Sequence, residues 1–231
     1  DLTMHNLKPA TIMDDTLLDS FEARLEAIVQ CFEYAGIRHV TAAEFLRSLR
    51  LNGGQLEVAF NQLEAQEGRV LKLLEIYREA YWAKQQDSID LYPGIRDLLQ
   101  RLRDMGKTLG VVTQKTWSVD ASGTWIGAAR ELKELGILDL FSVGVGFEHV
   151  DNYKPDPESV LLAIKELQAN PLLTVLVGDS AADIIAGRSA GCRTCQATWG
   201  VSPEQRNLVG VQADQIVASP DELLKFLILD F

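Results

Sequence analysis

Side chains that could bind a metal ion and a phosphate follow short apolar runs in this sequence. Six of them stand at or shortly after the ends of four such runs: Asp14, Asp15, Thr113, Lys154, Asp179 and Asp183. Carboxylates can hold a divalent cation, while a hydroxyl group and an ammonium group can bind and offset the charge of a phosphate. These residue types therefore indicate a metal-assisted phosphoryl-transfer site, provided that the fold brings them together.

The apolar runs predict the strands that would position these side chains. Residues 10–13, 109–112, 141–145, 174–177 and 194–197 resemble buried strands, and segments of helical periodicity separate most of them. This alternation predicts an α/β fold with a doubly wound, Rossmann-like parallel sheet. Ligands bind beyond the carboxyl ends of the strands in such sheets. We therefore expect the six polar side chains to converge at one edge.

Apolar residues at helical spacing predict the helices that cover this sheet. They are expected over 95–105, 125–135, 159–168 and 181–190, with a last helix from 219 onward. The stretch from Trp117 to Trp125 is expected to be a loop, and the sequence assigns it no function.

Residues 17–88 differ from the remainder because they predict consecutive helices with no strand between them. Thr41 and Glu44 have the spacing of a capping box at the start of the second of these helices. Residues 51–55 contain the Gly-Gly break that follows it. We therefore predict an all-helical insert at 17–88 within a core formed by 1–16 and 89–231.

Composition narrows the choice of partners. The 231 residues carry a net charge of -11, which disfavours nucleic acid and anionic membranes. No apolar run is long enough to span a membrane, and the N-terminus lacks the pattern of a signal peptide. Three cysteines in a chain of this size favour a reducing compartment, so a cytoplasmic location is expected. Cys192 and Cys195 form a C-x-x-C pattern, which we interpret as part of a buried strand rather than a zinc site.

Four segments, in order, resemble the signatures of the haloacid dehalogenase (HAD)-like hydrolase superfamily. They are Asp14–Ser20 (DDTLLDS), Thr113 after its strand, Lys154 in NYKPDPE, and Val177–Asp183 (VGDSAAD), the last continued by paired Ala-Gly steps. The helical insert falls where the type-one cap of this superfamily belongs. Tyr92–Gly94 looks like the return from that cap in phosphoglycolate phosphatase-like members.

The resemblance implies a Mg²⁺-dependent phosphatase and a role for each residue. Asp179 would bind the metal through its side chain, Asp14 through its main-chain carbonyl, and Asp183 would ligate it or orient a metal-bound water. Thr113 and Gln114 would bind the phosphoryl group, and Lys154 would offset its charge. Asp14 would also act as the general acid and base. The substrate would be a small phosphorylated metabolite, such as phosphoglycolate.

One part of the signature is missing. The superfamily's nucleophilic aspartate stands two positions before the acid/base aspartate, and Ile12 occupies that position. A hydrocarbon side chain can neither attack phosphorus nor bind Mg²⁺. Either the protein is an inactive relative that binds metal and phosphate, or an aspartate between Ile12 and Met13 is absent from the sequence as written. We favour the second hypothesis, because Thr113, Lys154 and both later aspartates remain in place.

Several alternatives within the superfamily differ in substrate. A dehalogenase is disfavoured because it needs neither a metal nor Asp14, and a phosphonatase because no cap lysine is identifiable. A phosphosugar mutase stays open, since it would use the same core with a different cap. Residues 51–55 are a candidate specificity loop, with a plain interhelical turn as the equal alternative. No sequence feature indicates an oligomeric state.

Overall fold

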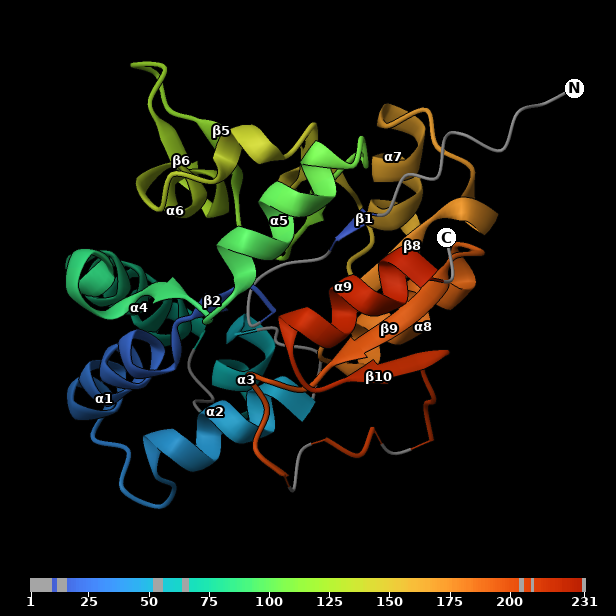
Figure 1. Cartoon of the computed structure of the whole chain (residues 1–231). Coiled ribbons are helices and arrows are strands. Elements are labelled where there is room, and N and C mark those ends of the chain that lie inside the picture. The colour runs from blue at the N-terminus through green and yellow to red at the C-terminus, as the bar shows by residue number, and fades with distance from the viewer. Residues whose placement is uncertain are drawn as a thin grey trace, which may run out of the picture. The chain divides into compact units, whose positions relative to one another are not determined.

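The computed structural model divides the chain into two compact units (Figure 1). One unit comprises residues 1–18 and 91–231, and the other comprises residues 19–90. The structure describes residues 10–11, 16–51, 56–63, 67–203, 206–208 and 210–229. None of the helices in these ranges combines the length and the apolar character that crossing a membrane requires.

The smaller unit is helical. Its helices are α1 (Phe21–Ala35), α2 (Ala42–Leu51), α3 (Leu56–Leu63) and α4 (Glu67–Ser88). Their apolar faces enclose one core, in which the ring of Phe45 lies edge-on to Phe32 and stacked on Phe60. The predicted capping box is confirmed, since the Thr41 amide donates to Glu44 Oε2 (2.9 Å) and the Glu44 amide donates to Thr41 Oγ1 (3.2 Å).

The larger unit contains the predicted parallel sheet. Its strands are β1 (Ala10–Thr11), β4 (Gly110–Val112), β7 (Val143–Val145), β8 (Val175–Gly178), β9 (Arg193–Ala197) and β10 (Gln215–Val217). β1, β8, β9 and β10 pair in that order, β4 pairs with β7, and β1 lies beside β4. The pairings of β1 with β8, β8 with β9, β9 with β10 and β4 with β7 are all parallel. The predicted α/β fold class is confirmed.

Helices cover both faces of this sheet. They are α5 (Ile95–Asp104), α6 (Ala128–Glu134), α7 (Glu158–Glu166), α8 (Ala181–Ser189) and α9 (Pro220–Leu229). One core cluster joins α7 and α8 to Leu176 of β8, while the neighbouring Val175 and Val177 are equally buried. Because successive side chains of a strand point to opposite faces, both faces of β8 must be covered.

Two sequence predictions are wrong in detail. Residues Trp125–Gly127 form strand β6, which pairs antiparallel with β5 (Trp117–Val119), so the helix begins at Ala128 and not at Trp125. The carboxylate of Asp120 closes the turn by accepting hydrogen bonds from the amides of Ser122 and Thr124. The segment expected to be a loop is therefore an ordered hairpin.

The helical segment also begins with a strand that the sequence did not predict. β2 (Leu18–Asp19) and β3 (Asp90–Leu91) form a two-stranded sheet where the chain passes from one unit to the other and back. Short 3-10 helices at Leu138–Leu140, Phe147–His149 and Pro171–Leu173 complete the connections of the larger unit.

Candidate active site

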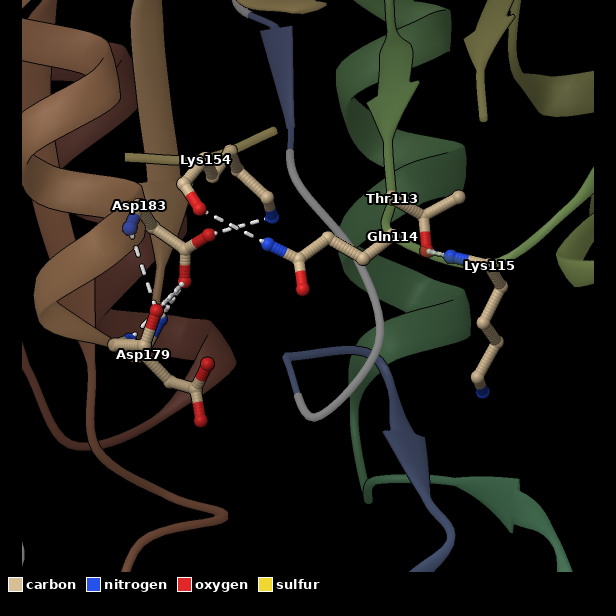
Figure 2. Close-up of polar contacts among 7 residues, drawn as sticks. Thr113, Gln114, Lys115, Lys154, Asp179 and Asp183 are labelled. Atoms are coloured by element: carbon tan, nitrogen blue, oxygen red, sulfur yellow. Dashed lines mark hydrogen bonds and ion pairs between the residues drawn. The ribbon is translucent and has the colours of Figure 1, made fainter. Parts of the chain in front are cut away.

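Four of the predicted site residues lie beyond the carboxyl ends of the parallel strands. Thr113 directly follows β4, Asp179 directly follows β8, and Asp183 lies in the first turn of α8. Lys154 belongs to the connection between β7 and α7. All four are buried, with exposed fractions from 3% to 8%. Figure 2 shows their arrangement. The remaining predicted ligand, Asp14, lies outside the described residues, as do Asp15 and the Ile12–Met13 junction.

A buried ion pair joins two of these residues. The ammonium nitrogen of Lys154 lies 2.6 Å from Oδ1 of Asp183, and both side chains are less than one-tenth exposed. Charges removed from water must be paired, because an isolated buried charge is strongly unfavourable. Each of these residues therefore fixes the position of the other, and the pair joins the β7–α7 connection to the first turn of α8.

The second oxygen of Asp183 organises the turn after β8. Oδ2 accepts hydrogen bonds from the Ser180 hydroxyl (2.7 Å), the Ser180 amide (3.1 Å) and the Asp179 amide (3.3 Å). Ser180 is the N-cap of α8, and its hydroxyl oxygen accepts a hydrogen bond from the Asp183 amide. A Cβ atom at Gly178 would overlap the Asp183 side chain, so this close approach requires glycine. Asp183 thus has protein partners on both oxygens.

The Asp179 carboxylate has a different orientation. Its main chain forms part of the Asp183 turn, but its carboxylate points away from that of Asp183 (Figure 2). A carboxylate in this place offers hard oxygen donors, which are the ligands that Mg²⁺ prefers.

The loop after β4 connects to the Lys154 loop through Gln114. The Gln114 side-chain amide donates to the main-chain carbonyl of Lys154 at 3.2 Å, and Figure 2 shows this side chain reaching across the site. The Thr113 amide donates to the Val145 carbonyl (2.9 Å), and the Thr113 hydroxyl accepts from the Lys115 amide (3.1 Å). Gln114 was expected to bind phosphate, and in the structure it ties together the two loops that carry Thr113 and Lys154.

Glu158 supports the loop that carries Lys154, a role that the sequence did not indicate. Its carboxylate accepts hydrogen bonds from the amides of Asp151 (3.0 Å) and Asn152 (2.9 Å) and from the Asn152 side chain (2.9 Å). The bonds from Asp151 and from the Asn152 side chain lower the pKa of Glu158 below its ordinary value. The available signal was an acidic residue directly before a predicted helix, which indicates capping in general but not these partners.

The β5–β6 hairpin is anchored beside the same loops. The Trp117 amide donates to Glu148 Oε1 at 2.7 Å, and the indole of Trp117 covers Gly144. A Cβ atom at Gly144 would overlap that ring, so the glycine leaves the space that the tryptophan fills. The ring of Trp125 lies edge-on to that of Trp117, at a centroid distance of 6.4 Å.

Comparison with known proteins gives the family. The model of the haloacid dehalogenase-like hydrolases matches residues 13–197. The chain is 30% identical to a phosphoglycolate phosphatase of Xanthomonas campestris, over 91% of each chain. It is 27% identical to the pyrophosphatase PpaX of Bacillus velezensis, over 92% of each chain. A solved haloacid dehalogenase-like hydrolase of Streptococcus pneumoniae is 25% identical, with a TM-score of 0.77 over 97% of this chain and 99% of the other. The resemblance read from the four sequence signatures is confirmed, and the chain belongs to the haloacid dehalogenase-like hydrolase family.

Proposed function

We propose that this protein is a Mg²⁺-dependent phosphatase that hydrolyses a small phosphomonoester, with phosphoglycolate as the first candidate. The observation that carries the proposal is the buried ion pair of Lys154 and Asp183. Gln114 connects this pair to the loop that bears Thr113, and Asp183 Oδ2 connects it to the main chain of Asp179. Relatives that match more than nine-tenths of this chain are named as phosphatases and pyrophosphatases, which supports hydrolysis of a phosphate bond.

Each described residue has a role that its contacts support. The hydroxyl of Thr113 would donate to a phosphoryl oxygen, and the ammonium group of Lys154 would offset charge that develops on the phosphoryl group. Asp183 would keep that ammonium group in place. Because both oxygens of Asp183 already accept hydrogen bonds from the protein, positioning suits this residue better than direct contact with a metal ion.

The donor chemistry of the site fits Mg²⁺. Among the described residues, no three acidic, histidine or cysteine side chains form a ligand cluster. Magnesium sites that handle phosphates commonly use one or two carboxylates together with water and substrate oxygens. Asp179 and, outside the described residues, Asp14 would hold the ion. When bound, it would offset the repulsion between an attacking carboxylate and a phosphate dianion.

The covalent chemistry depends on the segment around Ile12. An aspartate between Ile12 and Met13 would attack phosphorus, forming an aspartyl phosphate as the bond to the leaving oxygen breaks. Asp14 would protonate the leaving alkoxide and then take a proton from the water that cleaves the aspartyl phosphate. With Ile12 as written and no additional aspartate, the protein would instead be a metal- and phosphate-binding pseudophosphatase.

The helical unit is the proposed cap. The sequence places the boundaries of this insert at residues 17 and 88, and the compact helical unit spans 19–90. Substrate choice would reside in this unit, with residues 51–55 as the candidate specificity loop, although 52–55 lie outside the described residues. A phosphosugar mutase would share the core and differ in the cap, so product analysis must separate transfer from hydrolysis.

A phosphate-release screen on protein of verified intact mass tests the proposal. The substrates are 2-phosphoglycolate, several sugar phosphates and pyrophosphate, each with Mg²⁺ and with EDTA. We expect Mg²⁺-dependent release that Asp179→Ala abolishes. The control Asp97→Ala alters an exposed aspartate of α5 and should retain full activity. Absence of release from every substrate, by protein whose mass equals that of the sequence as written, would establish the pseudophosphatase instead.

A further inference from the structure

A second buried ion pair holds the loop that carries Thr113. Glu131 of α6 is fully buried, and its two carboxylate oxygens lie 3.1 and 3.0 Å from the ammonium nitrogen of Lys115. The Lys115 side chain is one-quarter exposed. Figure 2 shows that Lys115 and Gln114 leave the loop in different directions, with Gln114 crossing toward Lys154.

Stability alone does not explain a carboxylate at position 131. The neighbouring residues Ala128, Ala129 and Leu132 of α6 are also buried, so Glu131 interrupts an otherwise apolar helix face. Replacing a buried ion pair by well-packed apolar side chains is often neutral or stabilising. The pair therefore suggests a requirement for geometry, namely a fixed position of Lys115.

Fixing Lys115 also fixes the Thr113 hydroxyl group, because the two residues share a hydrogen bond. The amide of Lys115 donates to the Thr113 hydroxyl at 3.1 Å, while its ammonium group is held by Glu131. Lys115 is thus held at both ends, and its main chain sets the direction of the hydroxyl oxygen. The same contact offsets the charge of Lys115, which makes this lysine unsuited to serve as a second cation for the substrate.

We propose that Glu131 is a positioning residue, which acts through Lys115 to orient the Thr113 hydroxyl toward the phosphoryl group. The proposal rests on the proposed function, because Thr113 must donate to a phosphoryl oxygen for its orientation to matter. Misplacing such a donor lowers the rate of the chemical step more than it weakens substrate binding.

The experiment compares Glu131→Gln with a conservative variant and a control. The conservative variant, Lys115→Arg, keeps a cation that can pair with both carboxylate oxygens. Glu134→Gln removes the partner of Arg130 on the same helix, in a pair that is more than one-third exposed on both sides. Amide hydrogen exchange at Lys115 reports on the loop without any turnover, and kcat and KM for the best substrate of the phosphate-release screen report on catalysis. Should Glu131→Gln not fold, Lys115→Met/Glu131→Met tests the same point, because it leaves no charge buried.

In Glu131→Gln we expect exchange at the Lys115 amide to be faster by about ten-fold, and kcat to fall by about ten-fold with KM nearly unchanged. The Glu134→Gln control should behave as the wild type, and Lys115→Arg should lose less of kcat than Glu131→Gln does. Unchanged exchange at Lys115 in folded Glu131→Gln overturns the proposal, as does faster exchange with unchanged kcat, which would leave Glu131 a purely structural role. If the wild type were inactive, the proposed function would be refuted. The hydrogen-exchange comparison needs no turnover, so it would still decide whether Glu131 holds the loop.

Discussion

The ammonium group of Lys154 and the carboxylate of Asp183 lie 2.6 Å apart although 29 positions separate them in the sequence. This contact joins the loop before α7 to the first turn of α8, and in the proposed function it holds the lysine that offsets the charge of the phosphoryl group. Because both side chains are buried, the pair is sensitive to removal of either charge.

We therefore predict that Asp183→Asn destabilises the protein by about 3–5 kcal/mol, since it leaves the Lys154 charge buried without its counter-ion. Urea unfolding of Asp183→Asn, Lys154→Met and the double variant measures the coupling. The double variant should be more stable than the sum of the single effects implies, by about 0.5–3 kcal/mol. Strict additivity would show that the two groups do not interact in the folded protein.

The bond between Gln114 and the Lys154 carbonyl gives a second prediction. Gln114→Met keeps the length of the side chain and removes the amide donor, so it should cost about 1 kcal/mol of stability. It should also lower kcat, because the two loops lose their connection. Gln100→Met removes a similar side-chain bond, to Asp104 on the exposed face of α5, and should leave kcat unchanged. Equal kcat values for the two variants would contradict a positioning role for Gln114.

The sequence predicted the sheet and the sites at its edge because both depend on local patterns. Buried parallel strands are apolar runs, and the residues that follow them are determined by the chain order alone. Thr113 and Asp179 were therefore predictable from their places after β4 and β8. The N-cap of α8 is also a local feature, since Ser180 directly precedes the helix.

The unpredicted features depend on contacts between distant residues. Trp117 and Trp125 form a hairpin because an indole fills the space over Gly144, and Glu131 is buried because Lys115 reaches it. Strand β10 was missed because it has only three residues, two of them exposed, and gains its order by pairing with β9. Periodicity within a segment carries no information about such partners.

The contact between Gly144 and Trp117 can be tested by enlarging the first side chain and truncating the second. Gly144→Ala should destabilise the protein by about 1–3 kcal/mol, because its methyl group would overlap the indole. In a Trp117→Ala background the same substitution should have almost no cost. Chemical denaturation of the four proteins provides the measurement. A penalty at Gly144 that persists without the tryptophan ring would place its cause elsewhere, in the β7 backbone.

The three cysteines should be chemically inert in the folded protein. Burial raises the pKa of Cys192 to about 11 and that of Cys195 to about 12, and Cys31 likewise reaches about 12. Since the thiolate is the reactive form, iodoacetamide at pH 8 should modify none of them in the native state and all three in denaturant. Mass spectrometry of the intact protein counts the adducts. Rapid native labelling of Cys192 and Cys195 would contradict the structural interpretation of the C-x-x-C pattern.

The last prediction concerns Glu158 and the pH dependence of stability. Hydrogen bonds from the Asp151 amide and the Asn152 side chain lower its pKa in the folded state, and these bonds are absent in the unfolded chain. A carboxyl group with a lowered pKa in the folded state stabilises the fold above its unfolded pKa, and this contribution is lost as the pH falls through the folded value.

Glu158→Gln should therefore lower the Tm at pH 7, and its Tm should converge with that of the wild type as the pH falls below about 4.3, the ordinary glutamate pKa. Thermal unfolding between pH 3 and pH 7 measures this, with Glu166→Gln, an exposed position at the other end of α7, as the control. A Tm difference that stayed constant over this range would mean that the charge of Glu158 is not what holds the Lys154 loop. Convergence in acid would instead tie the stability of that loop to a single ionised carboxylate, because both the Asp151 and the Asn152 amides donate to it.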